Sequence, residues 1–529
     1  MKKIVGFLAS KAFQIPVVLL ATIGFLIVAL YSTLYPGFID HVEPNIASVA
    51  WVIGKGSPLY NSLDSVQRYS LLYGPLAYLP FTWGMTILGG SILSLKIVVL
   101  LAVIGIAVCL WLAYRRLLDR PKSAIVALIV IGFLMGGNLP YLLEVRGDVF
   151  IILCAAWALA AALSPNAILA ATLTALACAA GADVKLTGVL YFFPIYVLLG
   201  DRQGWKIAVA SLFAAGVLSF APFLIPGISL PGYLIWLHAA SRQPLGVGIQ
   251  NMLEYAVKFS LPILLLMWRF STINHAGFRT YLGQRRLFIV TLIACFFVMA
   301  VLCSKAGAGV HHLLPFCPLL GYFCADLYSA ANAQRTSGVI IHRSIPQFTC
   351  WLLVGLFFGA RLAGKIRGDL TVVAGQRPYA VALLKDVDGI MRTHPQDRIG
   401  MGYGETSLVP PMPAYASTYV RPALVMAGNP LTFDAAALCD MQLSGVEMPQ
   451  ADTNYMGSCG TTIWLIPKGE PPFSQVNLYS LYGPRVMPQR NLFNAAFRQA
   501  FFDHYHKAGS SRFFDIWSCV NKPNGSNGH

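Results

Sequence analysis

Long apolar stretches recur through the first two thirds of the chain and are separated by short polar breaks. A helix rises about 1.5 Å per residue and needs roughly 20 apolar residues to cross a bilayer. The first stretch is too long for a signal peptide and lacks a small-residue cleavage site, so we expect it to remain as a span. In all, eleven stretches, several of them shorter than ideal, are predicted to be spans: 14–35, 84–114, 124–143, 148–163, 166–182, 186–200, 206–225, 253–270, 287–303, 312–331 and 345–363.

The last part of the chain follows a different pattern. Residues 364–529 are rich in Pro, Gly, Tyr and Asn and contain no long apolar run, which indicates a water-soluble domain. Apolar residues alternate over 461–467, predicting a strand, and 494–505 has the spacing of an amphipathic helix. We therefore expect a transmembrane domain over 1–363 and a small α/β domain over 364–529.

Composition agrees with a membrane protein. Of 529 residues, 57% are hydrophobic and only 11% are charged, and the mean hydropathy is +0.64. Soluble domains carry roughly a quarter charged residues, so a soluble globular protein is excluded. A net charge of +16 could indicate a nucleic-acid partner, but residues 1–363 hold 24 Lys and Arg against 10 Asp and Glu. Because the excess lies between apolar stretches, no nucleic acid is expected.

The basic residues instead predict the orientation of the chain. Cytoplasmic loops of membrane proteins are enriched in Lys and Arg. A cytoplasmic N-terminus places fifteen of them inside: Lys2, Lys3, Lys11, Arg115, Arg116, Arg120, Lys122, Arg202, Lys206, Arg269, Arg279, Arg285, Arg286, Arg335 and Arg343. Six lie outside, namely Lys55, Arg68, Arg146, Lys185, Arg242 and Lys305. With an odd number of spans, the C-terminal domain is then periplasmic in a bacterium.

Carboxylates collect on the same outer side. Six of the ten in residues 1–363 are assigned there: Asp40, Glu43, Asp64, Glu144, Asp148 and Asp183. Charges at span ends are costly when they face lipid, so they usually face a cavity or each other. The outer face is therefore the candidate active site.

The first outer loop, over 35–83, carries the first candidates. Asp40 and Glu43 are three residues apart, which would place both carboxylates on one face of a helix beginning there. The alternative is that they only cap that helix. The loop is long, partly apolar and aromatic, and is expected to form interfacial helices.

Three further clusters follow the later spans. Glu144-Val145-Arg146-Gly147-Asp148 could be a surface ion pair of little energetic value, and Lys185 could be a flank of its helix that extends toward the interface. In the fourth cluster, Lys305 precedes His311 and His312. Adjacent His residues without a partner four positions away are a weak metal signal, so a divalent metal is not expected to be required.

The order of these motifs resembles the GT-C superfamily, polytopic membrane glycosyltransferases that use sugars carried on polyprenyl phosphate. The resemblance covers residues 1–363. It rests on the acidic pair after the first span, Gly56 to Tyr60, Tyr73 to Pro75, Arg146 to Asp148 and Lys185 to Gly188. The segment from Lys305 to Pro315 resembles a late loop that has Asn-Tyr in many members, where this chain has His311-His312. The resemblance implies a GT-C fold in the bacterial inner membrane, a polyprenyl-phosphate sugar as donor, and a glycan, lipid or protein as acceptor.

The chemistry of such a transfer assigns roles to these residues. A carboxylate must take the proton of the acceptor hydroxyl, and cations must stabilise the departing phosphate. Asp40 is the first choice of base and Glu43 the alternate. Expected phosphate ligands are Arg146, Lys185, Lys305 and His311, and expected supporting residues are Asp148, Arg68, Tyr60, Tyr73 and His312. One base without a second nucleophilic carboxylate suggests inversion, and fixed cations make a metal cofactor unnecessary.

Two other function classes remain open. A lipid-linked glycan polymerase or ligase would use similar donors and long outer loops. A transporter of a lipid-linked substrate would also have many spans, but it usually shows repeated halves with charges near the midplane. This chain shows no such repeat, and no nucleotide-binding, redox or hydrolase motif in a convincing context.

Three cysteines lie in the predicted soluble domain. Eight of the eleven occur at or before Cys350, mostly in spans, where they act as small apolar residues. A disulfide is plausible in an oxidising compartment, and the favoured pair is Cys439 with Cys459, leaving Cys519 free.

Overall fold

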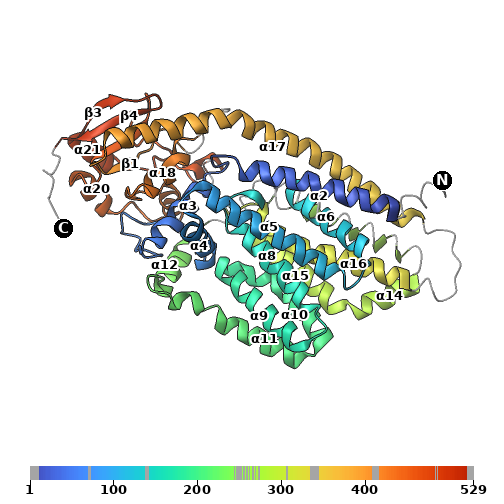
Figure 1. Cartoon of the computed structure of the whole chain (residues 1–529). Coiled ribbons are helices and arrows are strands. Elements are labelled where there is room, and N and C mark those ends of the chain that lie inside the picture. The colour runs from blue at the N-terminus through green and yellow to red at the C-terminus, as the bar shows by residue number, and fades with distance from the viewer. Residues whose placement is uncertain are drawn as a thin grey trace.

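The computed structural model describes residues 11–69, 73–136, 142–243, 275–305, 308–333, 345–407, 416–482 and 486–520, with residue 484 and scattered positions between 245 and 271. The described chain is mainly helical, with a small sheet near its C-terminus (Figure 1). Half of the expected span 253–270 lies outside these residues. So do five cations of the expected inner loops: Lys2, Lys3, Arg269, Arg335 and Arg343.

Helices make up the first part of the chain. They are α2 (Lys11–Thr33), α3 (Val42–Gly54), α4 (Leu79–Leu88), α5 (Ile92–Tyr114), α6 (Arg120–Gly136), α8 (Asp148–Ala162), α9 (Ala167–Val184), α10 (Val189–Gln203), α11 (Trp205–Leu218), α12 (Leu230–Ser241), α14 (His275–Gln284), α15 (Arg286–Leu302) and α16 (Cys317–Ala333). Short 3-10 turns connect them at η1 (Pro75–Ala77), η2 (Leu186–Gly188), η3 (Ala221–Leu224) and η4 (Val310–Phe316).

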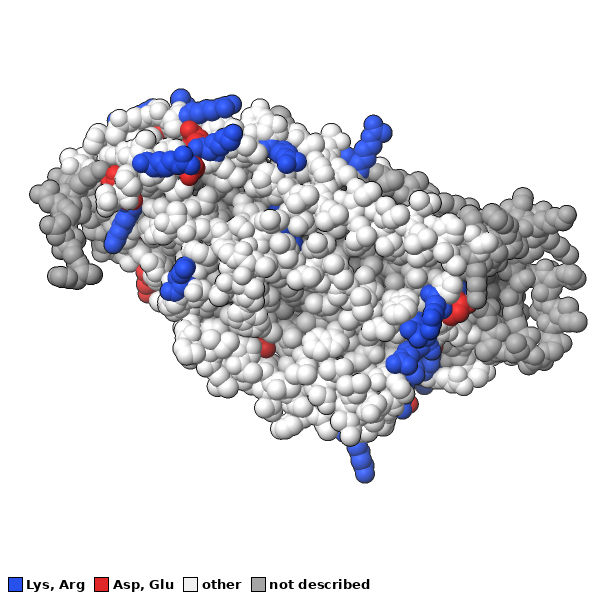
Figure 2. Space-filling model, in the orientation of Figure 1, with Lys and Arg blue, Asp and Glu red and all other residues white. Residues whose placement is uncertain are grey.

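Several of these helices have the length and surface of membrane spans. Four described segments are long and apolar enough to cross a membrane: Ile92–Tyr114, Ala167–Val184, Trp205–Leu224 and His311–Ala330. The pair α14 and α15, bent by 70°, would add a fifth. Large apolar side chains such as Leu101, Phe213 and Phe297 are exposed. Figure 2 shows most charged side chains toward the two ends, with few between them. These features are those of a multi-pass membrane protein, whereas the count of eleven spans remains a prediction.

The expected single span over 84–114 is wrong. Residues 84–114 form two helices, because α4 ends at Gly89, whose φ is +89°, a conformation that favours glycine. Helix α5 then begins after Ser91, whose Oγ accepts a hydrogen bond from the Ser94 N–H at 3.1 Å. Helix α4 belongs to the expected interfacial loop together with α3 and η1.

The C-terminal part contains the expected mixture of helices and strands. Its elements are α17 (Ile345–Thr393), β1 (Ile399–Met401), η5 (Ser417–Val420), α18 (Arg421–Met426), α19 (Ala435–Leu443), α20 (Gln450–Gly457), β2 (Ile463–Pro467), η6 (Leu478–Tyr482), α21 (Ala495–His504), β3 (Tyr505–Ser510) and β4 (Phe514–Cys519). The strand predicted over 461–467 and the helix predicted over 494–505 are confirmed as β2 and α21. The strand order is β1-β2-β4-β3, with β1 parallel to β2 and the other pairs antiparallel.

Helix α17 connects the two parts of the chain. It has 49 residues and runs along the molecule into the C-terminal part (Figure 1). The expected boundary at residue 363 lies inside this helix. Figure 1 shows the C-terminal elements at the same end as α3, α4 and α12, so the interfacial loop and the C-terminal part meet there.

The predicted disulfide is wrong. Cys459 is bonded to Cys519, and Cys439 is free and buried. The sheet determines the pairing: β4 ends at Cys519, where the Cys519 N–H donates to Thr462 O just before β2, and Cys459 lies shortly before that strand. Cys459 therefore pairs with Cys519 because β2 and β4 are neighbouring strands, although Cys439 is closer to Cys459 in the sequence.

The disulfide is expected to stabilise the C-terminal part. It closes a 60-residue separation, and Cys519→Ser should lower the free energy of unfolding by about 2–4 kcal/mol. Denaturant unfolding followed by near-UV circular dichroism measures this change. Cys439→Ser is the matched control, since it should leave the bridge intact. Mass spectrometry of non-reduced peptides showing Cys439 bridged would contradict the pairing.

Candidate active site

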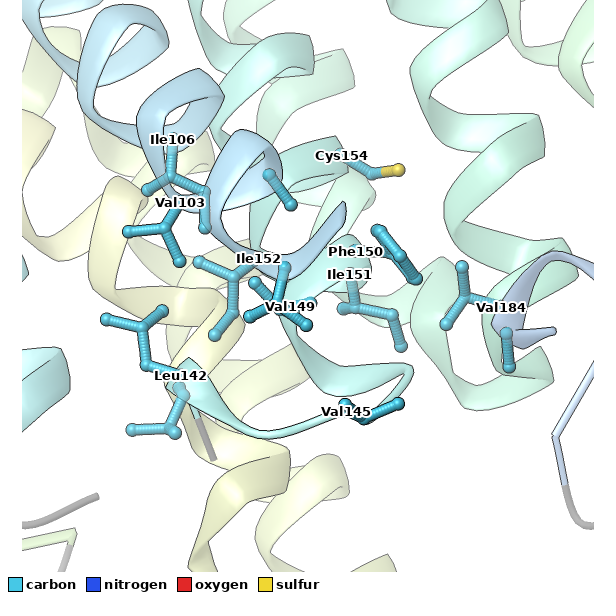
Figure 3. Close-up of a cluster of buried hydrophobic side chains, with 14 of the residues drawn as sticks. Val103, Ile106, Leu142, Val145, Val149, Phe150, Ile151, Ile152, Cys154 and Val184 are labelled. Atoms are coloured by element: carbon cyan, nitrogen blue, oxygen red, sulfur yellow. The ribbon is translucent and has the colours of Figure 1, made fainter. Parts of the chain in front are cut away.

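The turn between residues 144 and 148 is held by a buried apolar cluster. Val145 is buried in the same apolar cluster as Val149 and Ile152 of α8 and Val103 and Ile106 of α5 (Figure 3). Val145 and Val149 alternate with the charged residues of the turn, so burial of the two valines also fixes the positions of the charged side chains. Glu144, Arg146 and Asp148 are themselves at most 4% exposed.

Arg146 lies at the centre of three carboxylates. Its Nε donates to Asp148 Oδ2 at 3.1 Å, and its Nη1 lies 3.3 Å from Asp40 Oδ1 and 3.7 Å from Glu144 Oε2. The ion pair considered for this turn forms between Arg146 and Asp148 but is buried and not at the surface, and the structure adds Asp40 from 106 residues earlier. Such a guanidinium is held in a fixed direction by its ionic partners.

Lys185, His311 and His312 adjoin this group. Lys185 Nζ and His311 Nε2 both lie 3.9 Å from Asp148 Oδ1, and Lys185 Nζ lies 3.1 Å from His312 Nε2. The Lys185 ammonium is also 5.0 Å from the centre of the Tyr73 ring, a cation–π contact. Three separate motifs thus meet around Asp148.

Gly74 allows Tyr73 to approach Lys185. A Cβ on Gly74 would lie 2.0 Å from the carbonyl oxygen of Asp183, so only glycine fits at this contact. The Gly74 N–H donates to Val184 O at 3.0 Å, which fixes the loop against the end of α9. The Tyr60 hydroxyl donates to Tyr73 O at 2.9 Å, so Tyr60 supports Tyr73 from the far side.

The expected helix carrying both Asp40 and Glu43 is only partly confirmed. Helix α3 begins at Val42, because the Asp40 carboxylate accepts the Val42 N–H at 2.7 Å and holds the chain at the helix start. Asp40 therefore lies before the helix and does not share its face with Glu43. The Asp40 side chain is 26% exposed, whereas Glu43 is fully buried.

Glu43 has a web of backbone partners. Its Oε1 accepts the Val145 N–H at 2.8 Å, and its Oε2 accepts the N–H groups of Ile39 at 2.5 Å and Asp40 at 3.2 Å. These bonds tie the Asp40 loop to the Arg146 turn. Lys96 of α5 holds the chain that leads into this loop, because its Nζ donates to the carbonyls of Ser32 and Tyr35, each at 3.1 Å.

The charges of the cluster set different protonation states for its carboxyls. Burial raises the pKa of Asp40. The opposing effects of His41, Arg146 and the Val42 N–H are together larger, so the pKa of Asp40 lies below its ordinary value. Burial raises the pKa of Glu144 well above its ordinary value, and the neighbouring Asp40 and Glu43 carboxylates raise it further. Asp40 therefore loses its proton more readily than Glu144 does.

A cavity of about 750 Å³ opens beside the cluster. Its volume is in the range of pockets that enclose drug-sized ligands. Arg146, Lys185, Lys305, His311 and His312 line it, together with His41 and Tyr73. Asp40 adjoins it through its contacts with Arg146 and Val42. Six of the proposed site residues thus surround one space.

Arg68 lies elsewhere. Its guanidinium forms a bidentate pair with the Asp452 carboxylate of α20, and both side chains are fully buried. The Phe433 N–H donates to Val66 O at 3.1 Å beside it. Arg68 therefore joins the first outer loop to the C-terminal part and does not reach the cavity.

Some residues of the site carried no readable sequence pattern. Arg421, Asp434, Asp440 and Tyr479 of the C-terminal part line the same cavity. They lie in short helices and connections without a repeating motif. Lys96 did carry a signal, an ionisable residue inside an apolar helix, which often marks a functional or structural site.

Within the described ranges, no group of three or more His, Cys, Asp and Glu has a metal-binding arrangement. The expectation that a metal is not required stays a prediction.

Two solved structures resemble the chain over almost its whole length. ArnT from Cupriavidus metallidurans in the apo state aligns with a TM-score of 0.56 and 11% identity, covering 95% of this chain and 97% of that one. The same protein bound to undecaprenyl phosphate aligns with a TM-score of 0.51 and 12% identity, covering 96% and 99%. No protein-family model and no curated protein sequence matches the chain. At this identity the likeness shows the fold alone, which is that of ArnT.

The buried Arg68–Asp452 pair is expected to be costly to break. Asp452→Ala leaves a buried guanidinium without its partner, so the free energy of unfolding should fall by about 3–5 kcal/mol. Denaturation followed by Trp fluorescence measures the loss. The double variant Arg68→Met with Asp452→Leu removes both charges and should recover most of it. Equal losses in the single and double variants would contradict the pairing energy inferred here.

His41 is expected to shift the pH dependence of Asp40. Because His41 lowers the pKa of Asp40, His41→Gln should raise that pKa. A base is active when ionised, so the acid limb of kcat/KM should move to higher pH in this variant. Turnover of a lipid-linked donor measured from pH 4 to 8 tests this, with Asp64→Asn, an exposed carboxylate of the same loop, as control. If the acid limbs of the pH profiles of His41→Gln and wild type superimpose, the effect of His41 on the pKa of Asp40 is contradicted.

Proposed function

We propose that this protein transfers a sugar from a polyprenyl-phosphate donor to a hydroxyl of a cell-envelope glycan, lipid or protein. The observation that carries the proposal is the cavity in which Arg146, Lys185 and His311 gather beside an ionised carboxylate, at one end of a bundle of apolar helices. ArnT has the same fold and one of its structures holds undecaprenyl phosphate, which supports a lipid-phosphate donor for this chain as well.

The donor phosphate would lie against the cations. Arg146 can hold two phosphate oxygens with its planar fork, and Lys185 and Lys305 supply point charges. His311 adds a hydrogen bond from its ring. Asp148 contacts Arg146 and Lys185 and orients both, so it positions the phosphate ligands and does not react itself. Fixed cations do the electrostatic work here, and no metal is assigned to the reaction.

Asp40 would act as the general base. It takes the proton of the acceptor hydroxyl while that oxygen attacks the anomeric carbon. The bond from this carbon to the phosphate oxygen breaks, and its electrons remain on the phosphate, where the cations stabilise them. Attack from the face opposite the leaving phosphate inverts the anomeric centre. Glu43 is better suited to a positioning role, because its carboxylate is enclosed by three backbone N–H groups.

The orientation follows from the same scheme. We place the N-terminus in the cytoplasm and the cluster with the C-terminal part in the periplasm of a bacterial inner membrane. Cations at the opposite end support this assignment, since Arg115, Arg116, Arg120, Arg202 and Lys206 are all exposed at or next to helix ends.

Asp40→Asn is expected to lower kcat by about 10²–10⁴-fold, the usual contribution of a general base. The variant should still bind bare polyprenyl phosphate, because the cations are unchanged. Loss of a polyprenyl-phosphate monosaccharide, followed in proteoliposomes with a panel of pentose and hexose donors, measures turnover. Asp64→Asn is the matched control and should behave as wild type.

Three outcomes would argue against the proposal. Undiminished turnover in Asp40→Asn would remove Asp40 as the base. Products that grow by repeated units would indicate a polymerase or ligase. Movement of the intact donor across the membrane without loss of its sugar would indicate a transporter.

A further inference from the structure

The cavity has two chemically different walls. Three of its cations, Arg146, Lys185 and Lys305, come from the helical membrane part, and a fourth, Arg421, comes from the C-terminal part, where it is paired with Asp434. Two acidic residues that line it, Asp434 and Asp440, come from the C-terminal part. A phosphate is attracted to the first wall and repelled by carboxylates, so the second wall suits a different portion of the substrate.

Asp440 is held in place by neighbours from two other segments. Its Oδ1 accepts the Tyr479 hydroxyl at 2.6 Å and the Gln243 amide at 3.2 Å. All three residues line the cavity, and Asp440 is 7% exposed. Carboxylate, amide and phenol groups at one wall can accept and donate hydrogen bonds at several adjacent points.

Arg421 and Asp434 extend this wall. Arg421 Nη1 lies 3.1 Å from Asp434 Oδ1, and the Asn45 amide donates to Asp434 Oδ2 at 2.7 Å. The Arg421 side chain is 9% exposed, and its Nε has no hydrogen-bond partner within the part of the chain that the structure describes. The ion pair with Asp434 and the bond from Asn45 hold this part of the wall in place.

We propose that Asp440, Tyr479, Gln243 and Arg421 form a subsite for the hydroxyl groups of a sugar ring, opposite the phosphate ligands. This inference rests on the proposed function and specifies where a ring would bind. A ring carries several hydroxyls that both donate and accept, which matches a mixed wall of carboxylate, amide, phenol and guanidinium. The Tyr479 ring adds an apolar surface for the C–H face of the sugar.

The ring could belong to the donor or to the acceptor, and the two sources are separable by experiment. The probes are bare polyprenyl phosphate, polyprenyl-phosphate monosaccharides and methyl glycosides. Asp440→Asn keeps the size and one oxygen of the side chain, so its bonds to Gln243 and Tyr479 can persist. Asp503→Asn, an exposed carboxylate of α21, is the matched control.

If the donor sugar occupies the subsite, Asp440→Asn should weaken binding of the sugar-loaded lipid about tenfold, with bare polyprenyl phosphate unaffected. If the acceptor occupies it, binding of sugar-loaded lipid stays constant, while methyl glycoside binding, followed by saturation-transfer NMR, falls by about the same factor. Tyr479→Phe should weaken binding of the same probe, and it replaces Asp440→Asn in the test if that variant folds poorly. Either result supports the subsite and identifies its occupant.

Unchanged binding of both probes in folded Asp440→Asn and Tyr479→Phe would overturn the subsite. The proposed function has its own criterion in the same assay. If wild type does not bind bare polyprenyl phosphate, or if Arg146→Lys binds it as tightly as wild type, the donor assignment fails whatever the Asp440 variants show.

Discussion

Arg146 and its carboxylates are the interaction on which the outer end of the molecule depends. A guanidinium buried at the end of a membrane helix is costly without acidic partners, and here three carboxyl groups lie within 3.1–3.7 Å of it. Asp40 comes from the first outer loop, and Glu144 and Asp148 come from the turn before α8. The need to neutralise one cation therefore brings together segments that are about 100 residues apart in the chain.

The raised pKa of Glu144 limits the negative charge that collects around Arg146. Arg146 and Lys185 lie among the carboxyl groups of Asp40, Glu144 and Asp148, so each further ionised carboxylate would reduce the net positive charge of the group. Burial instead favours the protonated form of Glu144. The cations thereby retain attraction for an incoming phosphate, which is the property that the proposed chemistry requires.

The C-terminal part is bound to the membrane part by polar contacts at several points. Arg68 pairs with Asp452, Asn45 donates to Asp434, and Gln243 donates to Asp440. Buried polar groups of this kind are satisfied only in one arrangement, so they specify how the two parts meet. Two of these contacts also line the cavity, which links assembly of the molecule to the shape of its binding space.

Much of this could be read from residue order, and some of it could not. Apolar length, the strand over 461–467 and the motifs containing Asp40, Arg146, Lys185 and His311 depend on local composition and spacing, so residue order was enough to predict a multi-pass membrane protein and most of the cations that line the cavity. The partners of Arg68, Lys96 and Asp440 and the Cys459–Cys519 bridge depend on which distant segments become neighbours. These could not be read from the sequence, because a buried charge or thiol takes its partner from three-dimensional packing and not from its distance along the chain.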